Sequence, residues 1–354
     1  MTKKINLKDY GYRGNLANEP TVGRITELQR ERYTIITEYG EVAATLKGTF
    51  YHNAQIREDL PCVGDFVLMQ YNENGISLVT ELLPRYTKFS RADFLGSSAG
   101  HVKTAYEQVV AANFDYVFII TSLNQDFSLS RIVRYLTQAK QSGGTPVIIL
   151  TKADLDDNFQ KKIAEVRDAV PNVPVHAISS HTGFGLHELE EYLRPQKTSV
   201  FLGMSGIGKS SLINALMHSN VMDVKAIRED DSRGRHTTTH RQLFMLPNGA
   251  MVIDTPGMRE LGLYNAEEGI KYVFSDIEEL FSRCRFSNCQ HNTEPDCAVK
   301  TAIENGELSA KHWERYIYQK RETRYVDDKT AYMRERREWG KSISKFNRGK
   351  RGGR

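Results

Sequence analysis

Eight consecutive residues constrain the fold of this chain more than any other feature. The pattern G-x-x-x-x-G-K-[ST] is filled by Gly203, Met204, Ser205, Gly206, Ile207, Gly208, Lys209 and Ser210. We expect a strand at Ser199–Leu202 before it and a helix at Gly208–His218 after it. Its glycines let successive N–H groups face a phosphate, and the helix N-terminus adds positive potential. The pattern therefore predicts a nucleotide-binding phosphate loop.

Within this loop, Lys209 should bridge the β- and γ-phosphates, and the Ser210 hydroxyl should bind Mg²⁺. We also expect Ser211 to be among the nucleotide-binding residues. A second motif, D-x-x-G, begins at Asp254 directly after an expected strand at Met251–Ile253. The Asp254 carboxylate is predicted to lie in the second sphere of the Mg²⁺, and the Gly257 amide is predicted to sense the γ-phosphate.

A third motif predicts which base is bound. Thr151, Lys152 and Asp154 follow an expected strand at Pro146–Leu150. A carboxylate can accept hydrogen bonds from the ring N–H and the exocyclic amine of guanine, whereas adenine offers an acceptor at that ring position. The motif therefore favours GTP over ATP. We expect the Lys152 stem to pack on the base, and Ser179 and Ser180 to support the base from the next strand end.

A polar segment, residues 232–240, lies between the phosphate loop and Asp254. Its composition is typical of a loop that closes over a γ-phosphate, although an ordinary basic loop remains an alternative. One of its threonines could complete the Mg²⁺ shell; the candidates are Thr238 and Thr239, and the sequence does not decide between them.

Two regions with different periodicity predict a multidomain fold. Short strands at Thr21–Leu28, Tyr33–Thr37, Glu41–Leu46, Val63–Tyr71 and Ile76–Leu83 indicate an OB-like β-barrel over residues 1–84. Residues 85–112 are expected to form a connector with a short helix near Tyr106–Ala112. Residues 113–265 should form a P-loop α/β domain, a parallel sheet covered on both faces. Its other expected elements are strands at Tyr116–Ile120 and Val173–Ile178 and helices at Leu129–Ser142, Phe159–Ala169 and Gly185–Leu193.

The order of these motifs is unusual. In an ordinary GTPase the phosphate loop comes first, but here Thr151–Asp154 precedes Gly203–Ser210. Strands can keep their sheet positions when the chain is cut elsewhere, so the pattern predicts a circularly permuted GTPase. In this respect, and in its barrel and C-terminal cysteine cluster, the chain resembles the RsgA (YjeQ) family over nearly its whole length. The resemblance implies a GTPase stimulated by the small ribosomal subunit that acts as a late assembly checkpoint.

The residue after the D-x-x-G glycine bears on mechanism. Met258 stands where many GTPases have a water-orienting glutamine, and a thioether cannot both donate to and accept from a water. Intrinsic hydrolysis should therefore be slow. The family resemblance implies that His236 is the catalytic residue. His240 is a competing candidate, and a histidine without a role is the simpler alternative.

Residues 266–354 are expected to form a helical zinc-binding domain with a basic tail. Cys284, Cys289, His291 and Cys297 supply three thiolates and an imidazole, the ligand set of a closed structural Zn²⁺ site. We expect one structural zinc per chain, and the resemblance supports it. Free buried cysteines beside a chance histidine remain the alternative.

The net charge of +4 is unevenly distributed, because Lys311–Arg354 holds fifteen Lys or Arg and only six Asp or Glu. This cationic region predicts contact with RNA phosphates, and the resemblance implies the rRNA of the small subunit. The aromatic residues between these cations are expected to pack on the zinc domain more often than they stack on bases. The role of the tail at Lys341–Arg354 is left open.

No apolar run is long enough to span a bilayer, and no signal peptide is recognised at the start, so we expect a cytoplasmic monomer without membrane contact. Two alternatives to a subunit-stimulated GTPase remain. One is a GTP-gated RNA- or ribosome-binding module whose hydrolysis is incidental. The other is a GTPase that binds membranes or signalling proteins.

Overall fold

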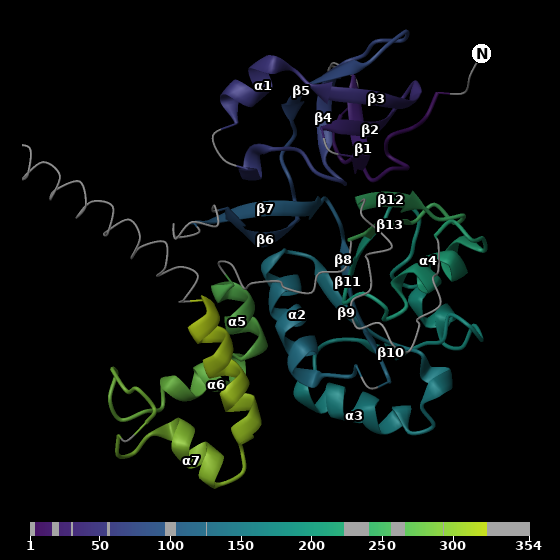
Figure 1. Cartoon of the computed structure of the whole chain (residues 1–354). Coiled ribbons are helices and arrows are strands. Elements are labelled where there is room, and N and C mark those ends of the chain that lie inside the picture. Colours follow the sequence, from purple (N-terminus) through teal and green to yellow (C-terminus); the bar gives the residue numbers. More distant parts are fainter. Residues whose placement is uncertain are drawn as a thin grey trace, which may run out of the picture. The chain divides into compact units, whose positions relative to one another are not determined.

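The computed structural model describes residues 4–15, 21–29, 31–54, 57–95, 104–124, 126–222, 241–255, 266–292 and 294–323 (Figure 1). The chain divides into two compact units. The first combines Met1–Ser90 with Val109–Glu260, and the second combines Arg91–Gln108 with Leu261–Arg354. Among the described residues, no helix has both the length and the apolar character needed to cross a membrane.

Five strands of the first unit form a closed barrel. They are β1 (Val22–Gln29), β2 (Arg32–Thr37), β3 (Gly40–Leu46), β4 (Phe66–Gln70) and β5 (Ser77–Leu82). The hydrogen-bonded order is β1-β2-β3-β5-β4, and β4 closes the barrel by pairing again with β1. The short α1 (Gly48–Asn53) and a 3₁₀ turn at Arg57–Asp59 lie between β3 and β4. The predicted OB-like barrel is confirmed.

The rest of the first unit is an α/β domain. Its strands are β8 (Tyr116–Ser122), β9 (Thr145–Thr151), β10 (Val175–Ala177), β11 (Thr198–Leu202), β12 (Arg241–Met245) and β13 (Met251–Asp254), and their order is β10-β9-β8-β11-β13-β12. All neighbours are parallel except β12 and β13, which are antiparallel. Because β11 lies centrally between β8 and β13, the phosphate-loop strand occupies the middle of the sheet.

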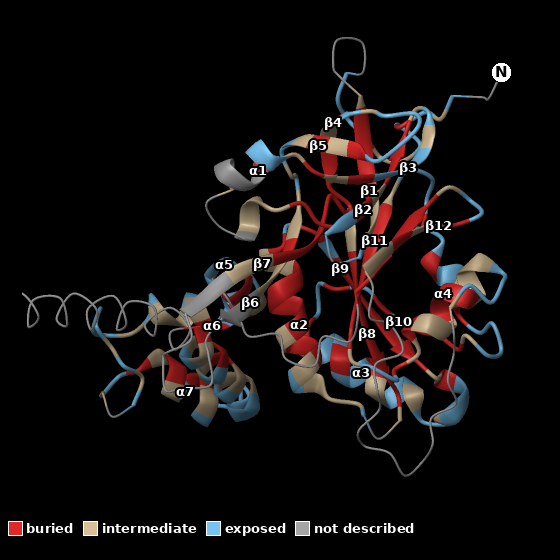
Figure 2. Ribbon diagram, turned by 45° about the horizontal axis from the view of Figure 1, so that its top comes forward, coloured by how far each residue is buried: buried red, intermediate tan, exposed pale blue. Residues whose placement is uncertain are grey.

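Helices cover both faces of this sheet (Figures 1 and 2). Phe118, Ile120, Val147 and Ile149 share a buried cluster with Leu212 of α4 (Lys209–Met217). The alternate residues of β8 and β9 point to the other face and are also buried, and α2 (Leu129–Gln141) and α3 (Phe159–Ala169) complete the layer that contacts β8, β9 and β10. Burial of both faces explains why these strands are continuous apolar runs.

Two local predictions were wrong. The expected connector at 85–112 contains two paired strands, β6 (Lys88–Leu95) and β7 (Thr104–Ala112), in place of a helix near Tyr106–Ala112. All four residues from Val109 to Ala112 are buried, so the alternation that marks a half-exposed strand is missing. The expected helix at Gly185–Leu193 is a 3₁₀ turn at Leu186–Leu189, with Pro195 close behind it.

Strand β12 was not predicted at all. It has only five residues and carries Arg241 and Gln242 at its start, so its composition gave no clear strand signal. It matters because β12 also pairs with β1, which joins the barrel and the α/β domain in one 11-stranded sheet. The division into residues 1–84, 85–112, 113–265 and 266–354 stays a prediction.

The second unit is mainly helical where it is described. It contains α5 (Glu267–Val273), α6 (Ser275–Phe281), α7 (Ala298–Glu304) and a further helix over residues 310–323. Phe274, Ile277, Val299, Leu308 and Tyr316 are buried and form the apolar interior of this small module. The predicted helical domain at this end of the chain is confirmed.

A buried arginine joins the barrel to the α/β domain. Arg24 of β1 is fully buried and donates to the carbonyls of Tyr10 (2.6 Å) and Asn113 (2.8 Å) and to Thr198 Oγ1 (3.0 Å). No carboxylate accepts from Arg24 in the hydrogen bonds of the described residues, and burial lowers the pKa of its guanidinium to about 10. A buried cation is costly unless its donors are satisfied, so each of these acceptors matters for the docking of the barrel.

We predict that Arg24→Met destabilises the first unit by about 2–4 kcal/mol, because several buried carbonyls lose their donor. The free energy of unfolding is measured by denaturant titration of the full chain. Arg13→Met is the matched control: Arg13 pairs with Asp115 at 2.9 Å, but its side chain is 58% exposed, so its loss should cost under about 1 kcal/mol. Equal effects of the two variants would contradict this interpretation.

Candidate nucleotide site and metal centre

The phosphate loop connects β11 to α4 at the carboxyl edge of the parallel sheet. Gly208 precedes α4 with φ of +102°, a conformation that L side chains rarely adopt. This conformation lets the backbone turn sharply into the helix, so the first amides of α4 are directed toward the loop. The predicted strand–loop–helix context of Gly203–Ser210 is present.

Two contacts bring the base-recognition segment against the phosphate loop. Thr151 at the end of β9 donates through Oγ1 to the carbonyl of Ile207 at 2.5 Å. Lys152 Nζ donates to the carbonyl of Gly206 at 3.0 Å. Residues about 55 positions apart in sequence are therefore adjacent at one edge of the sheet. The two motifs therefore lie next to each other, although their order in the chain is reversed.

Asp154 is free to face a ligand. It lies in the 3₁₀ turn Ala153–Leu155 after Lys152, which has φ of 62°. Ala153 is buried, and its N–H donates to the carbonyl of Ile178 at 3.1 Å, which ties this turn to the end of β10. The Asp154 side chain itself is exposed. The turn is therefore anchored on its buried side and presents a carboxylate on its open side.

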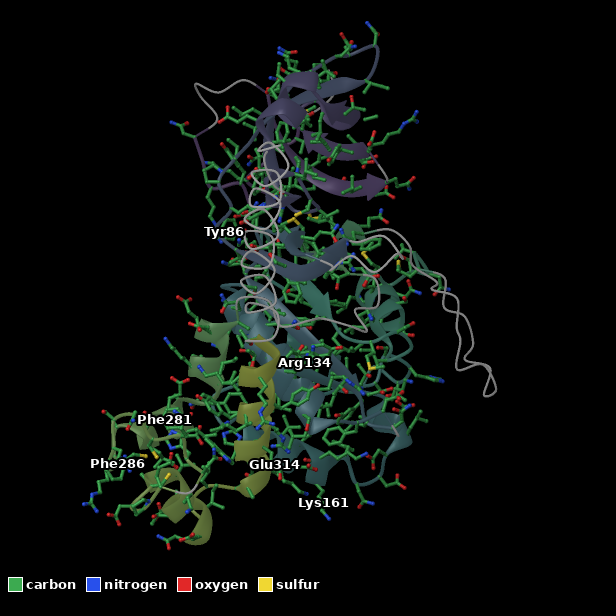
Figure 3. The ribbon with its side chains drawn as sticks, turned by 60° about the vertical axis from the view of Figure 1, so that its left-hand side comes forward. Tyr86, Arg134, Lys161, Phe281, Phe286 and Glu314 are labelled. Carbon is green, nitrogen blue, oxygen red and sulfur yellow. The ribbon has the colours of Figure 1, made fainter. Side chains whose placement is uncertain are left out.

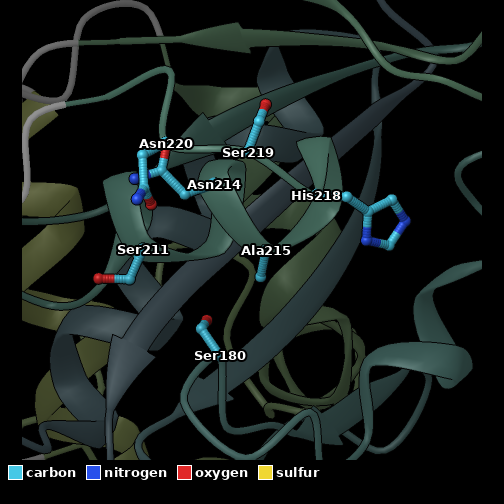
Figure 4. Close-up of a pocket in the computed structure, with 7 residues that line it drawn as sticks. All are labelled: Ser180, Ser211, Asn214, Ala215, His218, Ser219 and Asn220. Atoms are coloured by element: carbon cyan, nitrogen blue, oxygen red, sulfur yellow. The ribbon is translucent and has the colours of Figure 1, made fainter.

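The two serines after β10 have different surroundings. Ser179 is buried, and its Oγ accepts from the backbone N–H groups of His181 (3.3 Å) and Thr182 (3.2 Å). Its hydroxyl therefore shapes the loop. Ser180 instead lines a pocket of about 400 Å³ together with residues of α4 and the turn after it, namely Ser211, Asn214, Ala215, His218, Ser219 and Asn220 (Figure 4).

Sequence reasoning missed most of this pocket. Only Ser180 and Ser211 were predicted to contact nucleotide, and both lie on its wall. Asn214 holds the turn after α4 in place, because its side chain donates to the carbonyl of Met222 and accepts from the Met222 N–H, both at 2.8 Å. No short motif marks an asparagine with such a role, although its position on the helix of the phosphate loop was a usable signal.

Lys209 and Asp254 are both buried, and each influences the ionisation of the other. Lys209 Nζ donates to the carbonyls of Gly203 (2.8 Å) and Met204 (2.6 Å). Burial lowers the pKa of Lys209 to about 8, partly offset by Asp254. Burial also raises the pKa of Asp254, against the effect of Lys209. Burial therefore disfavours the charged form of both side chains, and a bound group of opposite charge would stabilise each of them.

Asp254 also has an unsatisfied oxygen. It ends β13 beside Phe201 of β11, and its Oδ1 is buried without a hydrogen-bond partner among the described residues. A buried, unpaired carboxylate oxygen next to the phosphate loop fits a site for a Mg²⁺ ion and its waters. Asp254 and Ser210 are therefore suited to the predicted Mg²⁺ site. His236, Thr238, Thr239, Gly257 and Met258 lie outside the described residues.

The four predicted zinc ligands converge. One ligand atom from each of Cys284, Cys289, His291 and Cys297 lies within 4.8 Å of the others. His291 Nδ1 is 3.6 Å from Cys284 Sγ and 3.5 Å from Cys297 Sγ. Ligands at ordinary Zn–S and Zn–N lengths in a tetrahedron are about 3.6 Å apart, so the cluster could hold a zinc ion.

Aromatic residues fix the histidine of this cluster. The His291 ring stacks on Phe281 at 4.3 Å, and the Trp313 ring meets it edge-on at 5.7 Å. Trp313 also stacks on Tyr316 at 5.5 Å (Phe281 is labelled in Figure 3). Two of the aromatic residues among the C-terminal cations therefore pack within the module, whereas Tyr318 is 64% exposed.

We predict that zinc removal by a chelator unfolds this module and shifts the fluorescence of Trp313 to longer wavelength, because Trp313 packs on a ligand. Cys297→Ser should produce the same spectrum without chelator, whereas Cys62→Ser, which alters a buried cysteine of the barrel, should retain zinc. Stoichiometry is measured by metal analysis of the purified chain. A wild-type zinc content near zero after purification with zinc would contradict the assignment.

The chain is similar to known proteins over most of its length. The model of a family described as RsgA GTPase matches residues 83–264. A Listeria innocua protein named small ribosomal subunit biogenesis GTPase RsgA 1 is 44% identical over 96% of both chains. A Methanosarcina acetivorans protein named small ribosomal subunit biogenesis GTPase RsgA is 40% identical over 83% of this chain and 77% of its own length.

Solved structures agree with the fold. The crystal structure of YjeQ from Thermotoga maritima gives a TM-score of 0.60 at 28% identity and covers 84% of this chain and 96% of its own. That of YloQ, described as a circularly permuted GTPase, gives a TM-score of 0.57 at 23% identity, covering 91% of this chain and 99% of its own. The likeness to YloQ bears on the fold alone. The predicted permuted P-loop domain is confirmed.

Proposed function

This chain belongs to the RsgA GTPase family and is a GTPase, and we propose that it hydrolyses GTP during a late step of small ribosomal subunit assembly, stimulated by the subunit itself. The names of its relatives support the small subunit as the particle on which it acts. The observation that supports the proposal is the hydrogen bond from Thr151 to the carbonyl of Ile207, because it holds the segment that contains Asp154 next to the phosphate loop.

Base and phosphates would be bound by different parts of that pocket. The Asp154 carboxylate accepts from the guanine ring N–H and exocyclic amine, and Ser179 and Ser180 support the base from the neighbouring loop. The backbone amides of Gly203–Ser211 surround the phosphates, and Lys209 exchanges its two carbonyl acceptors for phosphate oxygens. The negative charge of a triphosphate favours the protonated form of Lys209, which burial disfavours.

Hydrolysis requires a second set of groups. Ser210 would hold Mg²⁺ with one threonine, Thr238 or Thr239, and Asp254 would lie in the second sphere of the ion, which would neutralise charge on the phosphates. The buried, unpartnered Oδ1 of Asp254 supports this role. Gly257 would donate its amide to the γ-phosphate. His236 is proposed as the catalytic residue, because Met258 cannot orient a water molecule.

The C-terminal module is proposed to hold one structural Zn²⁺ through Cys284, Cys289, His291 and Cys297. Three thiolates with one imidazole form a closed ligand set that leaves no position for substrate. The module and the basic tail that follows it would contact the rRNA of the small subunit. We further propose that the protein acts as a monomer in the cytoplasm, where ribosomal subunits are assembled.

The second candidate function is a GTP-gated RNA- or ribosome-binding module in which hydrolysis is incidental. The absence of a water-orienting glutamine at position 258 favours it, since intrinsic turnover would then be low. The two candidates differ in what the small subunit does to turnover. A binding module stays slow even when it is saturated with subunits.

We predict that the subunit decides between these candidates. GTP turnover by the purified protein should rise by at least about tenfold with small subunits and not with large subunits. His236→Ala should lower the stimulated kcat by about a hundredfold and leave GTP affinity within about twofold, because the histidine acts only in hydrolysis. His240→Ala is the matched control. Unchanged stimulated kcat in His236→Ala would remove the catalytic assignment, and near-zero turnover with saturating subunits would favour the binding module.

We also predict that Asp154→Asn weakens GTP affinity by about a hundredfold or more and improves XTP affinity, because an amide matches the carbonyl that xanthine carries in place of the guanine amine. Affinities are measured by calorimetry with GTP, XTP and ATP. Asp157→Asn, in the same exposed stretch, is the control and should bind GTP normally. Equal losses for GTP and XTP in Asp154→Asn would contradict base reading by this carboxylate.

A further inference from the structure

The barrel is hydrogen-bonded to the strand next to the proposed Mg²⁺ site. Strand β1 pairs with β12 at Glu27–Gln242 and Leu28–Arg241. On its other side β12 pairs with β13, where Gln242 is opposite Asp254. One register row therefore runs from Glu27 through Gln242 to Asp254. Since neighbouring strands are about 4.8 Å apart, the backbone of β1 passes about 10 Å from that of Asp254.

A second contact reaches the same strand from the barrel. Gly64 lies in the loop before β4 with φ of +92°, and a Cβ placed on it would be 2.9 Å from Cδ1 of Ile253. Ile253 is the residue before Asp254. The barrel thus packs directly against Ile253, the residue before the proposed second-sphere carboxylate, and position 64 has no room for a larger residue.

The two connections between barrel and α/β domain differ in strength. Arg24 anchors the barrel near the opposite end of the sheet through several buried hydrogen bonds to Tyr10, Asn113 and Thr198. The β1–β12 ladder consists of two residue pairs at the very start of β12. A ladder of two residue pairs can open at little cost in free energy while the hydrogen bonds of Arg24 stay formed. Segments that move during function are drawn from such elements of low local stability.

We propose that Glu27 and Leu28 of β1 are positioning residues for hydrolysis. When paired, they fix the first residues of β12, and through Gln242 they fix the register of Asp254. This inference rests on the proposed function. The effect is on hydrolysis and not on nucleotide binding, because the base-reading turn and the phosphate loop follow β9 and β11, neither of which pairs with β1. A partner that binds the barrel therefore acts on Asp254, at the end of β13, through the single intervening strand β12.

The test combines a strand-breaking substitution with a reversible disulfide. Leu28→Pro removes the backbone N–H of a residue that pairs with Arg241 of β12 and with Tyr33 of β2, so the disulfide is needed to assign its effect to the β1–β12 ladder. Glu27→Cys with Gln242→Cys places two thiols on opposed residues of an antiparallel pair, within the Cα separation that a disulfide spans. Thr34→Cys with Ala43→Cys is the matched control, because this pair joins β2 to β3 inside the barrel. All variants are assayed zinc-loaded and full-length, without ribosomal particles.

We expect Leu28→Pro to lower the kcat for GTP by about tenfold and to change GTP affinity by less than about twofold. Oxidising the Glu27–Gln242 pair in the Leu28→Pro chain should restore most of the kcat, and reductant should remove the gain. The control disulfide should restore nothing. Gln242→Gly, a milder disturbance of the same ladder, should lower kcat in the same direction if the proline variant does not fold.

A loss that appears wholly in nucleotide affinity overturns the proposal, and so does a disulfide that forms without restoring kcat. Because every rate is measured on the protein alone, absence of stimulation by small subunits would reject the proposed function and leave this result standing. Conversely, if small subunits stimulate GTP turnover but Leu28→Pro leaves kcat unchanged, only the positioning role of Glu27 and Leu28 is rejected.

Discussion

The structure depends on one geometric constraint: parallel strands deliver their carboxyl ends to the same edge of a sheet, whatever their order along the chain. Strand β11 lies between β8 and β13, so the phosphate loop has a neighbour on each side. The hydrogen bond from Thr151 to Ile207 joins the end of β9, where the proposed base-reading turn begins, to the phosphate loop. A chain that presents its motifs in a permuted order can therefore still assemble one pocket, because the pocket is defined by sheet position.

Much of this arrangement could be predicted because its residues are constrained locally. A phosphate loop needs its glycines and lysine in a fixed pattern, and buried parallel strands need apolar runs. The helix at Phe159–Ala169 was predicted with its observed bounds for the same reason. The cysteine cluster could also be predicted, because three thiols and an imidazole within fourteen residues form a common ligand set for zinc, and their ligand atoms do converge.

What could not be predicted depends on contacts between distant segments. Arg24 is one of 48 Lys or Arg residues, and nothing next to it in sequence marks it as buried. Strand β7 lost its alternation because both of its faces are covered at Val109–Ala112. Strand β12 is short and starts with polar residues, so its importance follows only from its partners. The pocket residue Asn214 was missed for another reason: its bonds to Met222 are local, but they depend on the turn after α4, which no motif marks.

The shared sheet has a consequence for how the two halves of the first unit could be separated. Without β1, strand β12 would present unpaired N–H and C=O groups at a free edge, a surface on which another chain can add a strand. The barrel therefore also serves as an edge cover. An unrelated domain in place of this barrel would have to supply a strand that pairs with β12 in the same direction and register. The barrel and the nucleotide-binding domain are therefore expected to have been inherited together.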